Sequence, residues 1–283
     1  MNNQTLRLVI PDWQAGNNPT YALGAQILKA IAPANDNQPT VTIDVPTQTS
    51  NLEKKNGVFA QDVVKENLLK VKQVLQDQQP AKVITLGGNC QVSQAPIDYL
   101  NGQYDHLGVV WVDAHPDVST PKNFPYEHAM VLANLLQKGD PVFNQLVDHP
   151  LKPDQVFYVG LQEPNAAEKV LLPDDGLEYQ HHEGLSLTDL KAWVKENDIQ
   201  QLYIHFDIDV LSPHSFYATF LNNPQFTTKP NTPEGIANVP ETWQFLIDLN
   251  NQFNLAGLTI AEYLPWSAQQ LSNLMADLSI FNQ

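Results

Sequence analysis

Short apolar segments of strand length alternate along the chain with longer segments of helical periodicity. The strand-type segments are residues 5–10, 40–45, 82–86, 107–112, 155–161, 201–206 and 255–260. The helix-type segments are residues 19–31, 56–79, 128–136, 187–196, 242–250 and 267–281. Strands that are joined through helices form parallel sheets, because each connection has to return along the length of the sheet. The pattern therefore predicts an α/β fold with a mostly parallel sheet, in a single domain that spans residues 1–283.

Two clusters of metal-binding residue types follow two of these strand segments. The first comprises Asp113, His115 and Asp117, and the second comprises His205, Asp207 and Asp209. Alternate residues of an extended chain point to one side, so we expect each cluster to present its side chains together. Burial of several carboxylates without a cation is costly. The two clusters together predict a metal centre for Mn, Zn, Fe, Ni or Co, although either cluster alone is also compatible with a solvated turn.

Polar residues also follow other strand segments. Cys90 comes shortly after residues 82–86, Glu163 after 155–161, and Glu262 after 255–260. The carboxyl ends of parallel strands lie at one edge of the sheet, and ligands of open α/β sheets bind at that edge. We therefore expect these residues and the two clusters to form one site.

The composition narrows the range of partners. The chain has 15 Lys and Arg residues against 31 Asp and Glu residues, a formal net charge of −16. This balance argues against nucleic acid and anionic membranes as partners, and it favours cations such as metals, amines and guanidinium groups. A single cysteine cannot form an intramolecular disulfide and fits a reducing compartment. With no signal-peptide pattern and no apolar run long enough to span a membrane, the expected location is the cytoplasm.

Several motifs resemble the metal-binding signatures of the ureohydrolase family, which comprises arginases, agmatinases and formimidoylglutamases. The motifs are WVDAHPD at 111–117, HFDID at 205–209 and the Gly87-Gly88 turn, and the likeness extends to TPEG at 232–235 and LTIAE at 258–262. The resemblance implies a three-layer α/β/α domain around an eight-stranded parallel sheet. It also implies a dinuclear metal centre, usually manganese, and assembly into trimers or hexamers.

The resemblance assigns roles to the metal-binding residues. Asp113 and Asp207 would bridge two metal ions. His115 and Asp209 would complete the ligands of one ion, and Asp117 would bind the other. Two adjacent divalent ions lower the pKa of a shared water molecule. In this family the resulting hydroxide attacks the carbon of a guanidino or formimino group.

The resemblance also assigns roles in catalysis and substrate binding. His128 matches the histidine that carries protons, and histidine can accept and donate a proton at neutral pH. Glu262 matches the carboxylate that pairs with the guanidinium group of the substrate. The loop with Glu163 and Asn165 matches the loop that contacts the rest of the substrate. Without the resemblance, His128 is also compatible with a solvent-exposed residue at a helix start, and Glu262 with a surface residue at a strand end.

The turn at Gly87-Gly88-Asn89-Cys90 departs from the family pattern, which has Gly-Gly-Asp-His. A Cys90 thiolate is a soft ligand that favours Zn, Cu(I) or Fe over Mn, and a lone cysteine is also often a buried apolar residue. The manganese centre could therefore have two sites or one tight site. Three functions stay open: a guanidino or formimino hydrolase with one altered ligand, a binding or regulatory protein without catalysis, and a deacetylase-like zinc enzyme.

Overall fold

The computed structural model describes residues 2–48, 52–174 and 185–281. Its main sheet has seven strands in the order β2-β1-β5-β9-β8-β6-β7, and every pair of neighbours is parallel. The strands are β1 (Asn2–Ile10), β2 (Thr40–Thr42), β5 (Pro80–Gly87), β6 (Leu107–Val112), β7 (Val156–Val159), β8 (Gln201–Asp207) and β9 (Leu255–Ala261). Each strand overlaps one of the segments predicted from the sequence, so the parallel α/β fold is confirmed.

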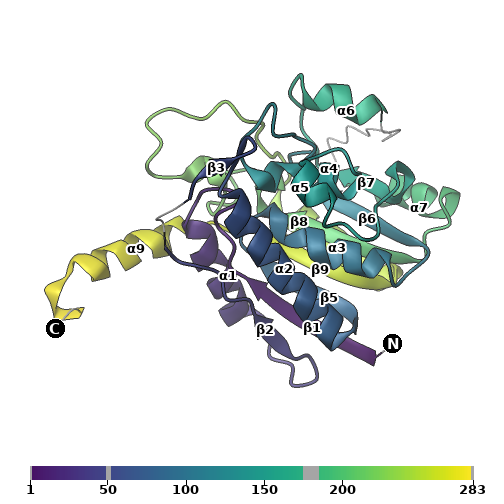
Figure 1. Cartoon of the computed structure of the whole chain (residues 1–283), viewed down its shortest axis with the longest axis horizontal. Coiled ribbons are helices and arrows are strands. Elements are labelled where there is room, and N and C mark those ends of the chain that lie inside the picture. Colours follow the sequence, from purple (N-terminus) through teal and green to yellow (C-terminus); the bar gives the residue numbers. More distant parts are fainter. Residues whose placement is uncertain (1, 49–51, 175–184, 282–283) are drawn as a thin grey trace.

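Helices cover both faces of this sheet and give three layers (Figure 1). Strand β6 shows why, since Val109 and Trp111 pack into one apolar cluster while Val110 and Val112 pack into another. The first cluster includes residues of α2 (Gln61–Gln78), α3 (Gln94–Asn101) and α4 (Val131–Leu135). The second includes residues of α7 (Leu187–Glu196) and α8 (Val239–Gln252), and α1 (Thr20–Ile31) packs beside it on β1 and β5. Because both faces of β6 are buried, its sequence is a continuous apolar run.

The structure differs from the sequence-based expectations in several elements. The described residues contain seven strands in the main sheet, not the eight that the resemblance implied. The expected helix at 56–79 begins only at Gln61, because Asn56, Gly57 and Ala60 have positive φ and residues 54–59 form a hairpin of β3 (Lys54–Lys55) and β4 (Val58–Phe59). The expected helix at 128–136 is a 3₁₀ turn, η2 (Glu127–Met130), followed by α4.

Each of the remaining helices contributes one buried residue to the first cluster, namely Phe143, Leu172 or Trp266. They are α5 (Pro141–Asn144), α6 (Glu168–Asp174) and α9 (Trp266–Asp277), and α9 extends away from the sheet (Figure 1). None of the described helices has the length and apolar character that crossing a bilayer requires.

Four adjacent strands, β5, β9, β8 and β6, place their carboxyl ends side by side at one edge of the sheet. The turn after β5 also lies against the residues that follow β1. A Cβ atom on Gly88 would lie 1.8 Å from the carbonyl oxygen of Asp12, so only glycine permits this approach. The turn therefore directs the following residues, Asn89 and Cys90, towards the ends of the neighbouring strands.

Candidate metal centre

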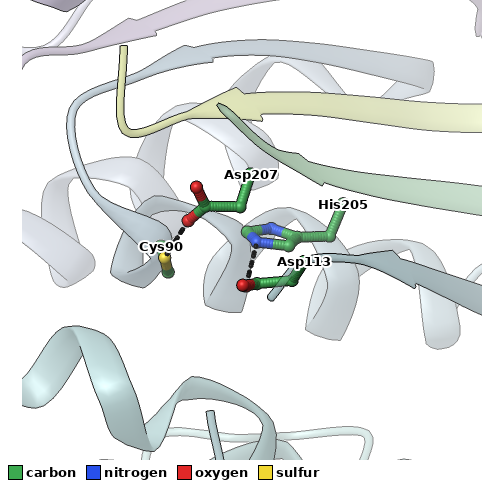
Figure 2. A group of neighbouring side chains, drawn as sticks. All are labelled: Cys90, Asp113, His205 and Asp207. Carbon is green, nitrogen blue, oxygen red and sulfur yellow. Dashed lines mark hydrogen bonds and ion pairs between the residues drawn. The ribbon is translucent and has the colours of Figure 1, made fainter. Parts of the chain in front are cut away.

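Four residues from three strands converge at this edge of the sheet. Cys90 begins the 3₁₀ turn η1 (Cys90–Ser93) after β5, Asp113 follows β6, and His205 and Asp207 lie on β8. Each of the four residues offers one potential ligand atom, and these four atoms all lie within 4.8 Å of one another (Figure 2). All four residues are buried. The edge thus combines a thiol, an imidazole and two carboxylates in one group.

The two predicted clusters do converge, but only part of this follows from strand geometry. His205 and Asp207 share one side of β8, as their alternation predicts. The first cluster instead begins where β6 has ended, at Val112, and its backbone bends from Asp113 onwards. Asp117 has φ of 49°, so the chain turns back towards the sheet there. Bends of the backbone, and not strand alternation, bring Asp113 and His115 together, while Asp117 belongs to neither ligand group and lines the adjoining cavity.

A second group of potential ligands lies next to the first. It consists of Asp113, His115 and Asp209, with ligand atoms that also lie within 4.8 Å of one another. His115 Nδ1 is 2.9 Å from Asp209 Oδ2, and His115 Nε2 is 3.0 Å from the hydroxyl of Thr232. Asp113 belongs to both groups. The geometry therefore offers two neighbouring positions for cations with a carboxylate between them.

Burial gives the carboxylates of this site unusual proton affinities. Burial raises the pKa of Asp117 and of Asp207 well above the usual value, and nearby carboxylates raise both further. Burial also raises the pKa of Asp209, to about 6, although His115 opposes the shift. Burial also acts to raise the pKa of Asp113. The contacts of this carboxylate with His115 and His205 outweigh the effect of burial, so the pKa of Asp113 lies below its usual value. Negative charge is therefore in excess at this site.

Two buried polar atoms of the site have no hydrogen-bond partner, Oδ2 of Asp117 and Nε2 of His205. Atoms of this kind are costly to bury unless something else satisfies them. A divalent cation would bind these lone pairs and neutralise the excess negative charge. The donor set therefore fits a metal ion.

Cys90 contacts carboxylates at this site. Its thiol donates to Oδ2 of Asp207 at 2.9 Å and lies 3.4 Å from Oε1 of Glu262. Burial raises the pKa of the thiol well above its usual value, and Asp117, Asp207 and Glu262 raise it further. A metal ion at this position would therefore have to displace a firmly held proton before the sulfur could bind it.

Glu262 and His128 form a pair at the same edge. His128 Nδ1 is 2.9 Å from Oε1 of Glu262, and the Tyr21 hydroxyl donates to Oε2 of Glu262 at 2.8 Å. Both carboxylate oxygens of Glu262 are thus held in place. Glu262 also has φ of 59°, which is unusual for a side chain of this size and is found where the surroundings enforce it.

A cavity of about 370 Å³ opens onto these groups. Its acidic and aromatic lining residues are Asp117, Glu168, Asp207, Asp209, Glu262, Tyr21, Phe124, Tyr126 and Phe220. Cys90, His115, His128 and Asn165 line it as well, and the described lining contains no lysine or arginine. The cavity therefore has the charge and size to admit a small cation.

The loop after β7 only partly reaches this cavity. Asn165 lines it, and its backbone N–H donates to Oε2 of Glu168 at 2.9 Å. Ser119 donates to the other oxygen of Glu168 at 3.2 Å. Glu163 lies apart, because its side chain is 66% exposed, is paired with Lys169 and is not among the lining residues. The structure therefore does not bring Glu163 together with the other predicted residues.

Sequence reasoning gave Tyr21 no role, and it counted His205 in the second cluster without assigning it as a ligand. Tyr21 lies on the apolar side of α1, where an aromatic residue indicates packing and not function. His205 did carry a signal, since it alternates with Asp207 on a buried strand.

Comparisons with known proteins identify relatives of this chain. The profile of the Arginase family matches residues 26–225. An arginase of Entamoeba histolytica is 26% identical over 173 residues, which cover 59% of this chain and 55% of that protein. An arginase of Bacillus caldovelox is 29% identical over 141 residues, 46% of this chain and 47% of that protein. The chain thus spans about half the length of the curated relatives it matches.

Solved structures extend the likeness in fold. Bacillus caldovelox arginase superposes with a TM-score of 0.78 at 19% identity and covers 93% of this chain and 91% of its own. Entamoeba histolytica arginase in complex with L-ornithine superposes with a TM-score of 0.76 over the same shares of the two chains, also at 19% identity. With the family profile covering well over half of its residues, the chain belongs to the arginase family.

Proposed function

We propose that this protein is a metal-dependent hydrolase that cleaves a C–N bond of a guanidino or formimino compound. The observation that carries the proposal is the position of the His128–Glu262 pair in the same cavity as the buried ligand groups. One side of the site thus fits metal ions, and the other side offers the Glu262 carboxylate and the His128 imidazole to a substrate.

The proposed ligands are the carboxylates of Asp113, Asp117, Asp207 and Asp209, together with His115 and Cys90. Divalent ions bound there lower the pKa of water and polarise the substrate. Asp113 contributes to both ligand groups, which fits a role as a bridge between two positions. Manganese is the metal that the family likeness favours, while Zn, Fe, Ni and Co suit the same donor types.

Glu262 would bind the cationic head of the substrate. A carboxylate offers two acceptor oxygens to a planar guanidinium or formamidinium group. The contacts with Tyr21 and His128 fix the direction of both oxygens. The Glu262 carboxylate therefore loses little conformational freedom when the substrate binds. The acidic lining of the cavity supports the same preference for a cation.

His128 would deliver a proton to the nitrogen that leaves. Its side chain lines the cavity and is fixed by Glu262, which keeps the ring close to the substrate. An imidazole can both accept and donate a proton near neutral pH, which suits this role.

The rest of the substrate would meet Phe124, Tyr126 and Phe220 and the Asn165–Glu168 loop. Since the described lining lacks a lysine or arginine, a tail with a carboxylate finds no cationic side chain there. We therefore propose an apolar, neutral or cationic tail. The single-domain organisation, the cytoplasmic location and the trimeric or hexameric assembly stay predictions.

A combined metal and activity measurement tests the proposal. Protein purified without chelator is analysed for bound metal and then assayed against a panel of guanidino and formimino compounds for release of urea, formamide or ammonia. Glu262→Gln is expected to keep the metal content of the wild type and lose most turnover. Glu196→Gln, an exposed change on α7, serves as the control. A protein without metal and without hydrolysis would support the binding or regulatory alternative.

A further inference from the structure

His205 is a completely buried histidine whose ring is held in one orientation. It stacks on Trp111 with ring centroids 3.7 Å apart and an interplanar angle of 13°. Its Nδ1 atom lies 2.7 Å from the hydroxyl of Ser93. The stack fixes the plane of the ring, and the Ser93 contact fixes which edge faces away from the cluster.

The opposite nitrogen of His205 points into the ligand group (Figure 2). Nε2 has no hydrogen-bond partner, and its nearest carboxylate oxygen, Oδ2 of Asp113, is 3.5 Å away. That oxygen already accepts a hydrogen bond of 3.1 Å from Trp111. A buried imidazole nitrogen with only this long ion-pair contact, and no hydrogen bond, is costly unless it binds something else. Histidine ligands of metals typically have their second ring nitrogen fixed by a hydrogen bond, as the hydroxyl of Ser93 does here.

The surrounding donors match a metal that accepts sulfur. The ligand atoms of Cys90, Asp113, His205 and Asp207 lie within 4.8 Å of one another. In a tetrahedral zinc site with bonds of roughly 2.0–2.3 Å, ligand atoms lie about 3.3–3.8 Å apart, so side-chain movements of about an ångström would complete the site. Thiolate and imidazole donors favour zinc over manganese, whereas the neighbouring group of Asp113, His115 and Asp209 has no sulfur.

We propose that His205 is a metal ligand and that Cys90, Asp113, His205 and Asp207 form a site selective for zinc over manganese. The inference rests on the metal centre of the proposed function and specifies its metal. The neighbouring position, with carboxylate and imidazole donors only, keeps its affinity for manganese. The two positions therefore differ in how strongly they prefer zinc to manganese.

Calorimetric titration of the metal-free full-length protein with zinc and with manganese tests the inference. His205→Asn suits the test, because its side-chain amide replaces Nδ1 near Ser93 and removes Nε2. A change in a contact around a ligand lowers metal affinity by about 10–100-fold, so loss of a direct ligand should weaken zinc binding by about 100-fold or more. Manganese binding at the neighbouring position should change much less. His214→Asn, at an exposed position, should bind both metals like the wild type.

X-ray absorption at one zinc equivalent per chain supplies a second readout. The wild type should show one sulfur at about 2.3 Å together with imidazole scattering. Cys90→Ser should remove the sulfur signal, and His205→Asn should reduce the imidazole signal. If His205→Asn does not fold, the wild-type spectrum still tests the inference. Ser93→Ala tests it as well, because this change removes only the hydroxyl beside Nδ1 of His205.

The outcomes separate this inference from the proposed function. A wild type that binds no divalent metal overturns the metal centre and the hydrolase with it. A wild type that binds metal, but shows no sulfur at the zinc ion or keeps its zinc affinity in folded His205→Asn, overturns only the assignment of His205. A ratio of zinc affinity to manganese affinity that is the same at both positions overturns the proposed selectivity.

Discussion

The Tyr21 hydroxyl donates a hydrogen bond of 2.8 Å to Oε2 of Glu262, a residue 241 positions further along the chain. Tyr21→Phe removes this donor and leaves the ring in place. Loss of a hydrogen bond to a charged group costs about 1.5 kcal/mol or more, so turnover should fall by about tenfold or more. Steady-state kinetics on an active guanidino or formimino compound, with metal analysis alongside, measures this. If turnover is unchanged, the bond does not orient Glu262 for catalysis.

Asp113→Asn should empty the site and not merely slow the reaction. Asp113 takes part in both ligand groups, and the amide removes the charge that balances the cations. Metal content after dialysis against buffer without chelator measures the effect. Asp98→Asn is the matched control, since Asp98 is a buried, hydrogen-bonded carboxylate away from the cavity. Full metal content in folded Asp113→Asn would remove Asp113 from the proposed ligands.

Cys90→His should shift the metal preference towards manganese. A neutral imidazole binds manganese readily, whereas the thiol has to lose a proton that burial and the nearby carboxylates hold firmly. Competition titrations with zinc and manganese compare the variant with the wild type and with Cys90→Ser. Two equally tight manganese sites in the wild type would show that the thiol does not weaken manganese binding.

Glu127→Gln should make the protein more stable at neutral pH. Burial raises the pKa of Glu127 well above its usual value of 4.5, and Asp140 raises it further. The folded state therefore binds a proton more tightly than the unfolded state, so this contribution to stability is complete below pH 4.5 and is lost as the pH rises through the folded pKa. The glutamine amide resembles the protonated acid and does not titrate.

Chemical denaturation of metal-free protein across a pH series measures this difference. The free energy of unfolding of Glu127→Gln should exceed that of the wild type by the least near pH 4.5, and the difference should grow with pH. The metal-binding carboxylates titrate in both proteins. The difference between the two free energies of unfolding therefore isolates the contribution of Glu127. Glu196→Gln, on the exposed side of α7, should show no such trend. A constant difference across the series would mean that Glu127 ionises normally.

Much of this fold could be predicted because its strands are buried on both faces. Short apolar segments such as Leu107–Val112 indicate strands without knowledge of their neighbours. Helix α3 was not predicted, since it has only 8 residues and carries the buried polar residues Gln94 and Asp98. The hairpin at 54–59 depends on positive φ at Asn56 and Gly57, which periodicity does not reveal.

The site could be predicted where residue type and strand ends coincide. The metal-binding residues and Glu262 all follow or end adjacent parallel strands, so their convergence follows from topology. The orientation of His205 could not be predicted, because it depends on the register that places Trp111 of β6 opposite His205 of β8. Glu163 follows a strand as well, but it turns outwards to Lys169.

Strand β9 follows every other strand of the sheet in the sequence, yet it lies between β5 and β8. Until residues 255–261 leave the ribosome, the sheet therefore consists of two separate halves, β2-β1-β5 and β8-β6-β7. Each half has an open edge, and open edges of this kind pair readily with other chains. Glu262 comes directly after β9, so the strand that closes the sheet also brings in a carboxylate of the site, and a chain that lacks β9 exposes two sheet edges that favour aggregation.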